Sequence, residues 1–188
     1  NINGESDLSY LTKTFSAGTP TTWTVSLWVK VNNPDNQNHL FFAGPDGSNR
    51  AQVTIEASGV LNAEFSTSGT TTGHKVTTRV LREPNSWYHI VIAVDTTIAS
   101  PAGDRIKIYI NGERETSFTS STDFAEDYQT QWMGAQTHTI AKRNYSADYF
   151  EGKMSQMYNI DGQALGPENF GFTDPLTNVW RPKKYEGT

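Results

Sequence analysis

The stretch from Trp87 to Phe118 constrains the fold more strongly than any other part of this chain. Every second residue of Trp87–Asp95 is a tyrosine, isoleucine or valine, a period of two that is typical of a strand with a buried face. The alternation resumes at Ile106 after a polar loop. Asn111-Gly112 then supplies the residue types that a type I′ turn requires. Glu113–Phe118 is expected to return as the next strand, so this stretch predicts an antiparallel meander.

Similar short alternating segments lie on both sides of the meander. We expect strands at Leu8–Phe15, Thr22–Val31, His39–Ala43, Ala51–Ala57, Val60–Ser66, Lys75–Leu81, Thr137–Lys142 and Tyr149–Tyr158. Ser120–Gln131 is expected to be a loop, Gln163–Phe170 a short helix and the tail irregular. Many short strands with regularly spaced turn signals predict an all-β jelly-roll sandwich of two antiparallel sheets. We expect one domain over residues 1–188.

The composition excludes several classes of partner. The net charge of −5 and the pI of about 5.3 argue against a nucleic-acid or anionic-membrane surface. The longest apolar run is about five residues, whereas a membrane span needs about 20, so no membrane insertion is expected. The absence of cysteine excludes disulfides and thiolate metal sites. Because the sequence starts at Asn1 and not at Met, we expect it to belong to a longer chain or assembly.

Four blocks of sequence resemble the laminin-G-like, concanavalin-A-like lectin and glucanase family. These blocks are Trp23–Val31, Trp87–Asp95, Ile106–Phe118 and His138–Leu165, and they occur in the family's order. The tail Phe170–Thr188 resembles the ending of a subgroup found in bacteriophage structural proteins. The resemblance implies a jelly roll in a virion-associated protein. Ser155-Gln156 stands where the family commonly has an acidic pair, so residue roles are not transferred from acidic members.

The chain shows no catalytic pattern that we would expect of a hydrolase. A retaining glycosidase needs two carboxylates about 5–5.5 Å apart. The segment that comes closest to such a carboxylate pair is Glu113-Arg114-Glu115. It follows the predicted turn at a strand tip and is interpreted as a solvated hairpin. We therefore expect the protein not to be an enzyme.

A calcium ion is the one cofactor that the sequence suggests. Carboxylate and amide oxygens on loops suit this ion, and the candidate ligands are Asp46 with Asn49, Asp104, and Asn144 with Asp148. Some members of the resembling family also carry a calcium at the sandwich rim. Asp and Asn are equally the usual residues of tight turns, so turn formation is the alternative interpretation of the same residues.

A sugar site needs an exposed aromatic ring with planar polar groups beside it. Arg143, Asn144, Tyr145 and Asp148 offer this mixture within seven residues, and Trp132 is a candidate neighbour. The alternative is that Tyr145 and Tyr149 only cover the edge of a sheet.

These observations predict a non-catalytic carbohydrate-binding or adhesion module. We expect it in a phage virion or otherwise outside the cell, where it would recognise a host-surface glycan. The partners would be that glycan or other virion subunits, and a homo-oligomer is compatible with the sequence. The alternative is a purely structural module that mediates virion or subunit assembly without binding sugar.

Overall fold

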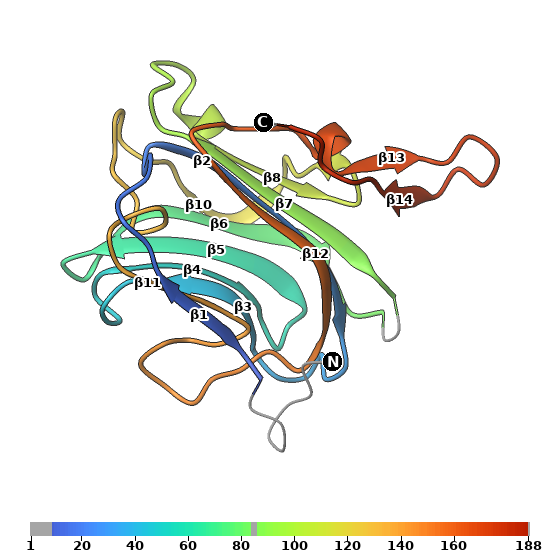
Figure 1. Ribbon diagram of the computed structural model, residues 1–188, viewed down its shortest axis with the longest axis horizontal. Helices are drawn as coiled ribbons and strands as arrows, with labels where there is room; N and C mark the ends of the chain where they lie inside the picture. Colours follow the sequence, from blue (N-terminus) through green and yellow to red (C-terminus); the bar gives the residue numbers. More distant parts are fainter. Residues whose placement is uncertain (1–8, 84–85, 188) are drawn as a thin grey trace.

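The computed structural model describes residues 9–83 and 86–187, and these form two large antiparallel sheets packed face to face (Figure 1). The seven-stranded sheet has the order β1 (Leu11–Thr14), β11 (Thr137–Ile140), β3 (Asn38–Ala43), β4 (Arg50–Ile55), β5 (Val60–Thr67), β6 (Thr70–Val80) and β10 (Phe118–Thr122). The five-stranded sheet has the order β12 (Gly152–Asp161), β2 (Thr22–Val31), β7 (Tyr88–Asp95), β8 (Ile106–Ile110) and β9 (Glu113–Arg114). The predicted all-β sandwich is confirmed. Leu8, in the first predicted strand, lies outside the described residues.

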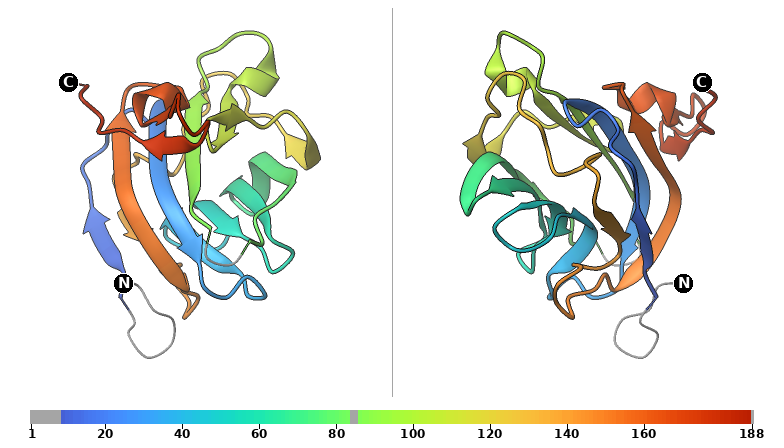
Figure 2. Two further views of the ribbon diagram at one scale, coloured as in Figure 1. Left: turned by 90° about the vertical axis from the view of Figure 1, so that its right-hand side faces the viewer. Right: turned by 60° about the vertical axis from the view of Figure 1, so that its left-hand side comes forward.

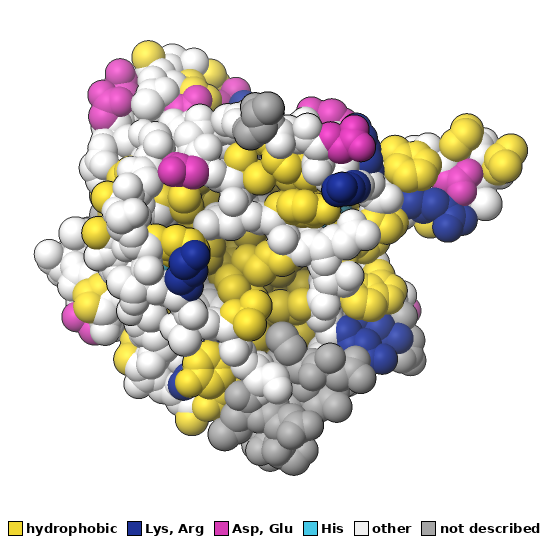
Figure 3. All heavy atoms as spheres, in the orientation of Figure 1, with side chains coloured by type: hydrophobic (Ala, Val, Ile, Leu, Met, Phe, Trp, Pro, Cys, Tyr) yellow, Lys and Arg dark blue, Asp and Glu magenta, His cyan; other side chains and the backbone are white. Residues whose placement is uncertain are grey.

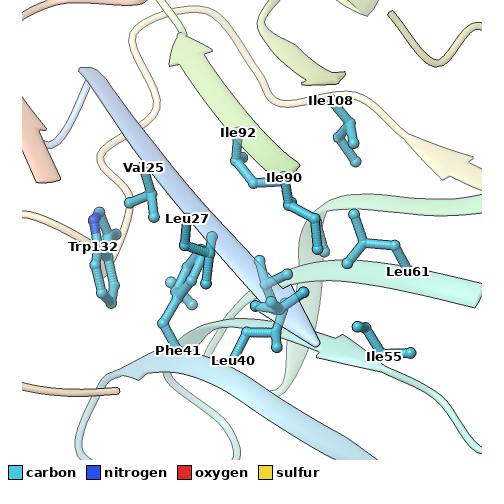
Figure 4. Close-up of a cluster of buried hydrophobic side chains, with 14 of the residues drawn as sticks. Val25, Leu27, Leu40, Phe41, Ile55, Leu61, Ile90, Ile92, Ile108 and Trp132 are labelled. Atoms are coloured by element: carbon cyan, nitrogen blue, oxygen red, sulfur yellow. The ribbon is translucent and has the colours of Figure 1, made fainter. Parts of the chain in front are cut away.

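The core lies between the sheets and is built from the alternating faces that the sequence shows. In the five-stranded sheet, Leu27 pairs with Ile90, and both side chains are fully buried. Val53 and Leu61 face them from the seven-stranded sheet, also fully buried. Figure 4 shows members of this cluster converging from both sheets. Burying one such side chain contributes about 1.5–3 kcal/mol, so the two apolar faces determine how the sheets pack.

The predicted turn at Asn111-Gly112 is confirmed, but the strand after it is shorter than predicted. Asn111 has φ 52° and Gly112 φ 84°, as a type I′ turn requires. Strand β9 ends at Arg114, and the chain then crosses to the other sheet, where β10 pairs with β6. The prediction of one strand over Glu113–Phe118 and of a loop from Ser120 is therefore wrong. The polar segment Phe118–Thr122 instead forms a strand that pairs with the edge of β6.

The C-terminal part also differs from the prediction. The helix expected at Gln163–Phe170 is reduced to the 3₁₀ turn η2 (Pro167–Asn169), and a second 3₁₀ turn, η1 (Ala102–Asp104), precedes β8. The tail expected to be irregular forms a hairpin of β13 (Gly171–Thr173) and β14 (Trp180–Pro182). Figures 1 and 2 show this hairpin projecting from the packed sheets.

Candidate functional site

The connection between β11 and β12 folds into a small closed loop over the end of the seven-stranded sheet. The backbone N–H of Arg143 donates to the carbonyl oxygen of Asp148 at 2.9 Å, which closes residues 143–148. The Arg143 guanidinium pairs with the Asp148 carboxylate at 3.1 Å, and the Ser146 hydroxyl donates to the same carboxylate at 2.8 Å. We call residues 143–148 the Tyr145 loop. Four of the five predicted ligand-binding residues lie in it.

Two side chains hold this loop against β3. The Asn144 amide donates to the Gly44 carbonyl oxygen at 2.5 Å. The Tyr145 ring packs edge-on against Phe42, with 5.4 Å between ring centroids and an angle of 72° between planes. Tyr145 nevertheless remains 43% exposed. The loop therefore presents a fixed aromatic ring to solvent, with the Arg143 guanidinium 5.3 Å from its centroid.

A chain of planar polar groups runs from the Tyr145 loop across β4 and β5. Arg143 donates to the Gln52 side-chain oxygen at 3.3 Å, and the Gln52 amide donates to Glu64 at 3.0 Å. Arg50 donates to the other oxygen of Glu64 at 2.5 Å. The chain stands on the outer face of the seven-stranded sheet, opposite Val53 and Ala63, which line the core. Gln52 is only 3% exposed, so the partly buried groups that this chain brings to the surface are the two guanidinium groups and the Glu64 carboxylate.

Several polar atoms in this network lack a partner among the described residues. Six buried side-chain atoms in the described part of the chain have no hydrogen bond, and three of these belong to Arg50, Arg143 and Asn144. Buried polar groups are nearly always hydrogen-bonded, so a concentration of exceptions marks a place where a partner is missing. Three of the six exceptions therefore lie near the exposed Tyr145 ring, although each of these atoms is itself buried.

A buried histidine adjoins the same network. The His39 side chain is fully buried, with Nε2 3.1 Å from the Gln37 side-chain oxygen and 4.0 Å from Asp148. Burial, followed by the nearby Arg143 charge, lowers the pKa of His39 to about 4, although Asp148 acts in the opposite direction. His39 is therefore neutral near pH 7. A polar pocket of about 280 Å³ opens on the other side of Asp148, between Gln37 and Glu151.

Trp132 does not lie beside the Tyr145 loop. Its side chain is 1% exposed and packs against Phe41, with ring centroids 4.4 Å apart, while its N–H donates to Asn159 at 2.9 Å. The expectation of an exposed ring is wrong, because this large apolar side chain fills the open edge of the core. There it lines a hollow of about 400 Å³ near β1 and β12. Figure 3 shows apolar side chains gathered between these strands.

The candidate calcium ligands do not form one cluster: Asp46 and Asn49 share a turn, whereas Asp104 lies elsewhere, and Asn144 and Asp148 lie in the Tyr145 loop. Asp46 accepts hydrogen bonds from the backbone N–H groups of Ser48 and Asn49, at 2.7 and 2.9 Å, and these bonds lower its pKa. Asp104 lies in a different connection, and its hydrogen bond with Arg114 lowers the pKa of its carboxyl group. Asp46 and Asp104 therefore lie in separate connections, each with a hydrogen-bonded carboxylate, and are not placed to share one calcium ion. No cluster of three or more acidic, histidine or cysteine residues suited to a metal occurs in residues 9–83 and 86–187.

The acidic pair at the hairpin tip is engaged by an arginine. Arg79 contacts Glu113 at 2.8 Å and Glu115 at 2.7 Å, so one guanidinium lies between the two carboxylates. The side chain of Glu115 is only 6% exposed, and burial raises its pKa. The pair therefore forms a structural ion-pair cluster between β6 and the β8–β9 hairpin.

The sequence did not reveal Gln52, Glu64, Arg50 and His39 as neighbours of the Tyr145 loop. In the sequence, these residues are distinguished only by lying at outward-facing positions of strands with alternating residues. Many exposed strand residues share such positions, so the pattern does not identify a site. Register supplies the missing information: Gln52 pairs with Glu64 across β4 and β5, and β3 places Phe42 next to Gln52. Arg143 reaches this group from 91 residues away in sequence.

The two packed antiparallel sheets with a polar, aromatic-edged outer face define a lectin-like sandwich. Residues 3–168 match the family model described as the concanavalin A-like lectin/glucanases superfamily. The chain belongs to that superfamily, which confirms the resemblance at family level. No curated protein sequence matches the chain. Among residues 9–83 and 86–187, no helix has the length and apolar character needed to cross a membrane.

Solved structures with the same fold share little sequence with this chain. Domain 4 of an extracellular arabinanase from Geobacillus stearothermophilus, in complex with arabinotriose, is 20% identical with a TM-score of 0.56, over 82% of this chain and 65% of that one. A sialidase CBM40 of Ruminococcus gnavus bound to α2,3-sialyllactose is 14% identical with a TM-score of 0.55, over 84% and 95%. Mouse laminin α1 domains LG4-5 are 11% identical with a TM-score of 0.58, over 85% and 41%.

Proposed function

We propose that this chain is a non-catalytic carbohydrate-binding module that recognises a cell-surface glycan through the Tyr145 loop and the adjoining face of β4 and β5. The observation that carries the proposal is the 43% exposed Tyr145 ring with the partly buried Arg143 guanidinium beside it. The apolar face of a pyranose stacks on such a ring, and planar groups bind its hydroxyls. Two structures with the same fold were solved with bound oligosaccharides.

The proposal extends to an extracellular, virion-borne protein that displays several copies of the module. It rests on the resemblance of the tail Phe170–Thr188 to bacteriophage structural proteins. A shallow surface with one stacking ring gives weak binding at a single site. Multivalent display raises the overall strength by about 10²–10⁴, which suits a particle that attaches to a polysaccharide-coated cell.

The test is a glycan-array screen of the purified protein on multivalent particles, repeated on intact host-cell polysaccharide. Tyr145→Ala is expected to abolish binding, and Tyr145→Phe is expected to retain most of it because the ring remains. Phe172→Ala is the matched control, since Phe172 is similarly exposed, at 45%, but lies on the projecting hairpin. A blank result on arrays and polysaccharide, or equal binding by Tyr145→Ala, would contradict the proposal.

A second candidate function is an assembly contact made by the β13–β14 hairpin. Leu176 at its tip is 93% exposed and Val179 is 52% exposed. Figure 3 shows apolar side chains at this projecting tip. The tip is well fixed, because Asp174 accepts a hydrogen bond from the Leu176 N–H at 2.9 Å and pairs with Arg181 at 2.6 Å. Under this alternative, Leu176→Asp would change the oligomeric state or virion incorporation, and Tyr145→Ala would change neither.

A further inference from the structure

The outer face of the five-stranded sheet carries a stack of aromatic side chains that the Tyr145 site does not use. Trp28 of β2 stacks on His89 of β7, with centroids 4.9 Å apart and 17° between planes. The Trp180 ring of β14 lies nearly parallel to His89, with centroids 6.0 Å apart and 23° between planes. His89 is held by Ser26 at 2.8 Å and by the Trp180 N–H at 2.9 Å. These contacts hold the three rings in fixed positions on the outer side of the sheet, although His89 itself is fully buried.

A pocket of about 200 Å³ opens at the end of this stack. It is lined by Trp28, Trp87, Ser155, Gln156 and Pro182. The walls are mostly apolar, and Trp87 is 40% exposed. All five lining residues are uncharged, which favours an uncharged ligand. Pockets for drug-sized ligands measure about 300–1,000 Å³, so this one suits a single ring.

The backbone of β12 places two polar side chains, Ser155 and Gln156, at the pocket. Ser155 lies opposite Trp28 in the pairing of β12 with β2, and the register then shifts before Tyr158. Gln156 sits in this bulge with φ 47°, in the left-handed region that residues other than glycine rarely adopt. Bulges next to binding sites redirect side chains, and strained residues cluster at such sites. Here the bulge places the Gln156 side chain at the pocket.

One residue that lines the pocket carries an unsatisfied donor. The Trp28 indole N–H is buried and has no hydrogen-bond partner among the described residues, although Trp28 as a whole is 8% exposed. A buried donor without a partner is costly to the folded state.

We propose that this pocket is a second binding site, which takes one uncharged pyranose ring between Trp28 and Trp87, with its hydroxyls at Ser155 and Gln156. The ligand class rests on the proposed glycan-binding function, whereas the pocket is independent of the Tyr145 loop. The two sites lie on opposite sheets, so each can be inactivated alone. A glycan or a pair of glycan chains bound at both sites would be held by two faces of the same module.

The experiment follows the five indole N–H signals of the ¹⁵N-labelled protein by NMR. The probes are the methyl glycosides of glucose, galactose and mannose, and N-acetylglucosamine. At least one probe is expected to shift the Trp28 and Trp87 signals saturably, while those of Trp23 and Trp132, buried in the core, stay in place. Trp87→Ala is expected to weaken binding by about tenfold.

Two variants separate this site from folding effects and from the first site. Gln156→Gly removes the amide but suits the left-handed backbone, so it is expected to weaken sugar binding while preserving or raising thermal stability. Tyr145→Ala is expected to leave the Trp28 and Trp87 shifts unchanged. Sugar shifts that persist unaltered in both Trp87→Ala and Gln156→Gly would overturn the proposal.

Other outcomes identify which proposal fails. If glycan binding requires Tyr145 but no probe moves the Trp28 or Trp87 signals, the second pocket is overturned and the Tyr145 site stands. If the probes move these signals while Tyr145→Ala binds glycans normally, the Tyr145 site is overturned and the pocket stands. A proline-rich peptide that shifts the two signals when sugars do not would overturn the sugar assignment in favour of a peptide.

Discussion

The indole N–H of Trp180 donates a hydrogen bond to Nδ1 of His89 at 2.9 Å. This bond connects the C-terminal hairpin to the centre of the five-stranded sheet. The same indole ring covers the turn at Gly112, where an added Cβ atom would lie 2.6 Å from a ring carbon. The turn, the histidine and the tail therefore form one packed unit, although Trp180 lies 91 residues after His89 in the chain.

Gly112→Ala is expected to destabilise the protein more than an ordinary glycine substitution. The left-handed backbone at φ 84° costs an alanine about 1–2 kcal/mol, and displacing Trp180 adds about 1–3 kcal/mol. Gly69→Ala is the matched control, because Gly69 has φ 76° but an added Cβ would meet nothing within 4 Å. Urea unfolding of both variants measures the difference. Equal losses would show that Trp180 does not pack on the turn.

Stability is expected to fall between pH 6.5 and pH 4 because of two buried histidines. Burial lowers the pKa of His89 to about 4, and burial with the Arg143 charge does the same for His39. Above pH 6.5 both are neutral whether folded or unfolded, so their contribution is fully present. As the pH falls towards 4, only the unfolded chain binds the protons, and each histidine costs on the order of 3 kcal/mol by the end of that window.

Unfolding free energies measured from pH 7.5 to pH 5 test this expectation, since most carboxylates remain ionised there. His89→Gln is expected to lower stability at pH 7.5, because it breaks the Trp180 bond, and to reduce the slope with pH. The double variant with His39→Gln should have a flatter profile still. An unchanged slope in the double variant would show that other groups govern the pH dependence.

Chelation of calcium is expected to change neither glycan binding nor thermal stability. Asp46 already accepts two backbone N–H groups, and Asp104 is paired with Arg114. Melting curves and polysaccharide binding with calcium and with EDTA test this. Asp46→Ala should lower stability equally in both conditions, because it removes a turn hydrogen-bond acceptor. A rise in melting temperature on adding calcium, lost in Asp46→Ala, would show that the turn binds the ion after all.

The strands were predictable where a period of two coincided with β-branched and aromatic residues. The observed bounds of β2, Thr22–Val31, are the predicted ones, because ten alternating residues leave no other way to bury Val25 and Leu27. Phe118 shows the limit of this approach. Its segment has strand character, but the sequence does not specify which sheet edge it joins, since either edge can accept backbone hydrogen bonds.

The candidate site was predictable only in its local part. Arg143, Asn144, Tyr145 and Asp148 form one loop because they are neighbours in the chain. Trp132 was misplaced because an isolated tryptophan after a polar segment fits an exposed or a buried position equally well. The strand partners of the loop depend on the register of β3, β4 and β5, which becomes visible only in the assembled sheet.

Arg143→Lys is expected to weaken glycan binding about tenfold while changing the unfolding free energy by less than about 1 kcal/mol. Arginine contacts Asp148 and Gln52 at once, at 3.1 and 3.3 Å, and also lies by the Tyr145 ring. A lysine keeps the charge but lacks the planar fork that makes both contacts, so the loop would lose its fixed orientation towards the sheet. The measurements are polysaccharide binding by the multivalent protein and urea unfolding.

Arg82→Lys is the control for this last variant, because Arg82 is exposed and makes one long contact, 3.4 Å, to the Ala57 carbonyl oxygen. It should bind glycan as the unmodified protein does. Since the two exchanges are chemically identical, a loss confined to Arg143→Lys would assign the effect to the Arg143 fork. If both variants bound equally well, the orientation of the Tyr145 loop would not matter for recognition, and the stacking ring alone would have to account for it.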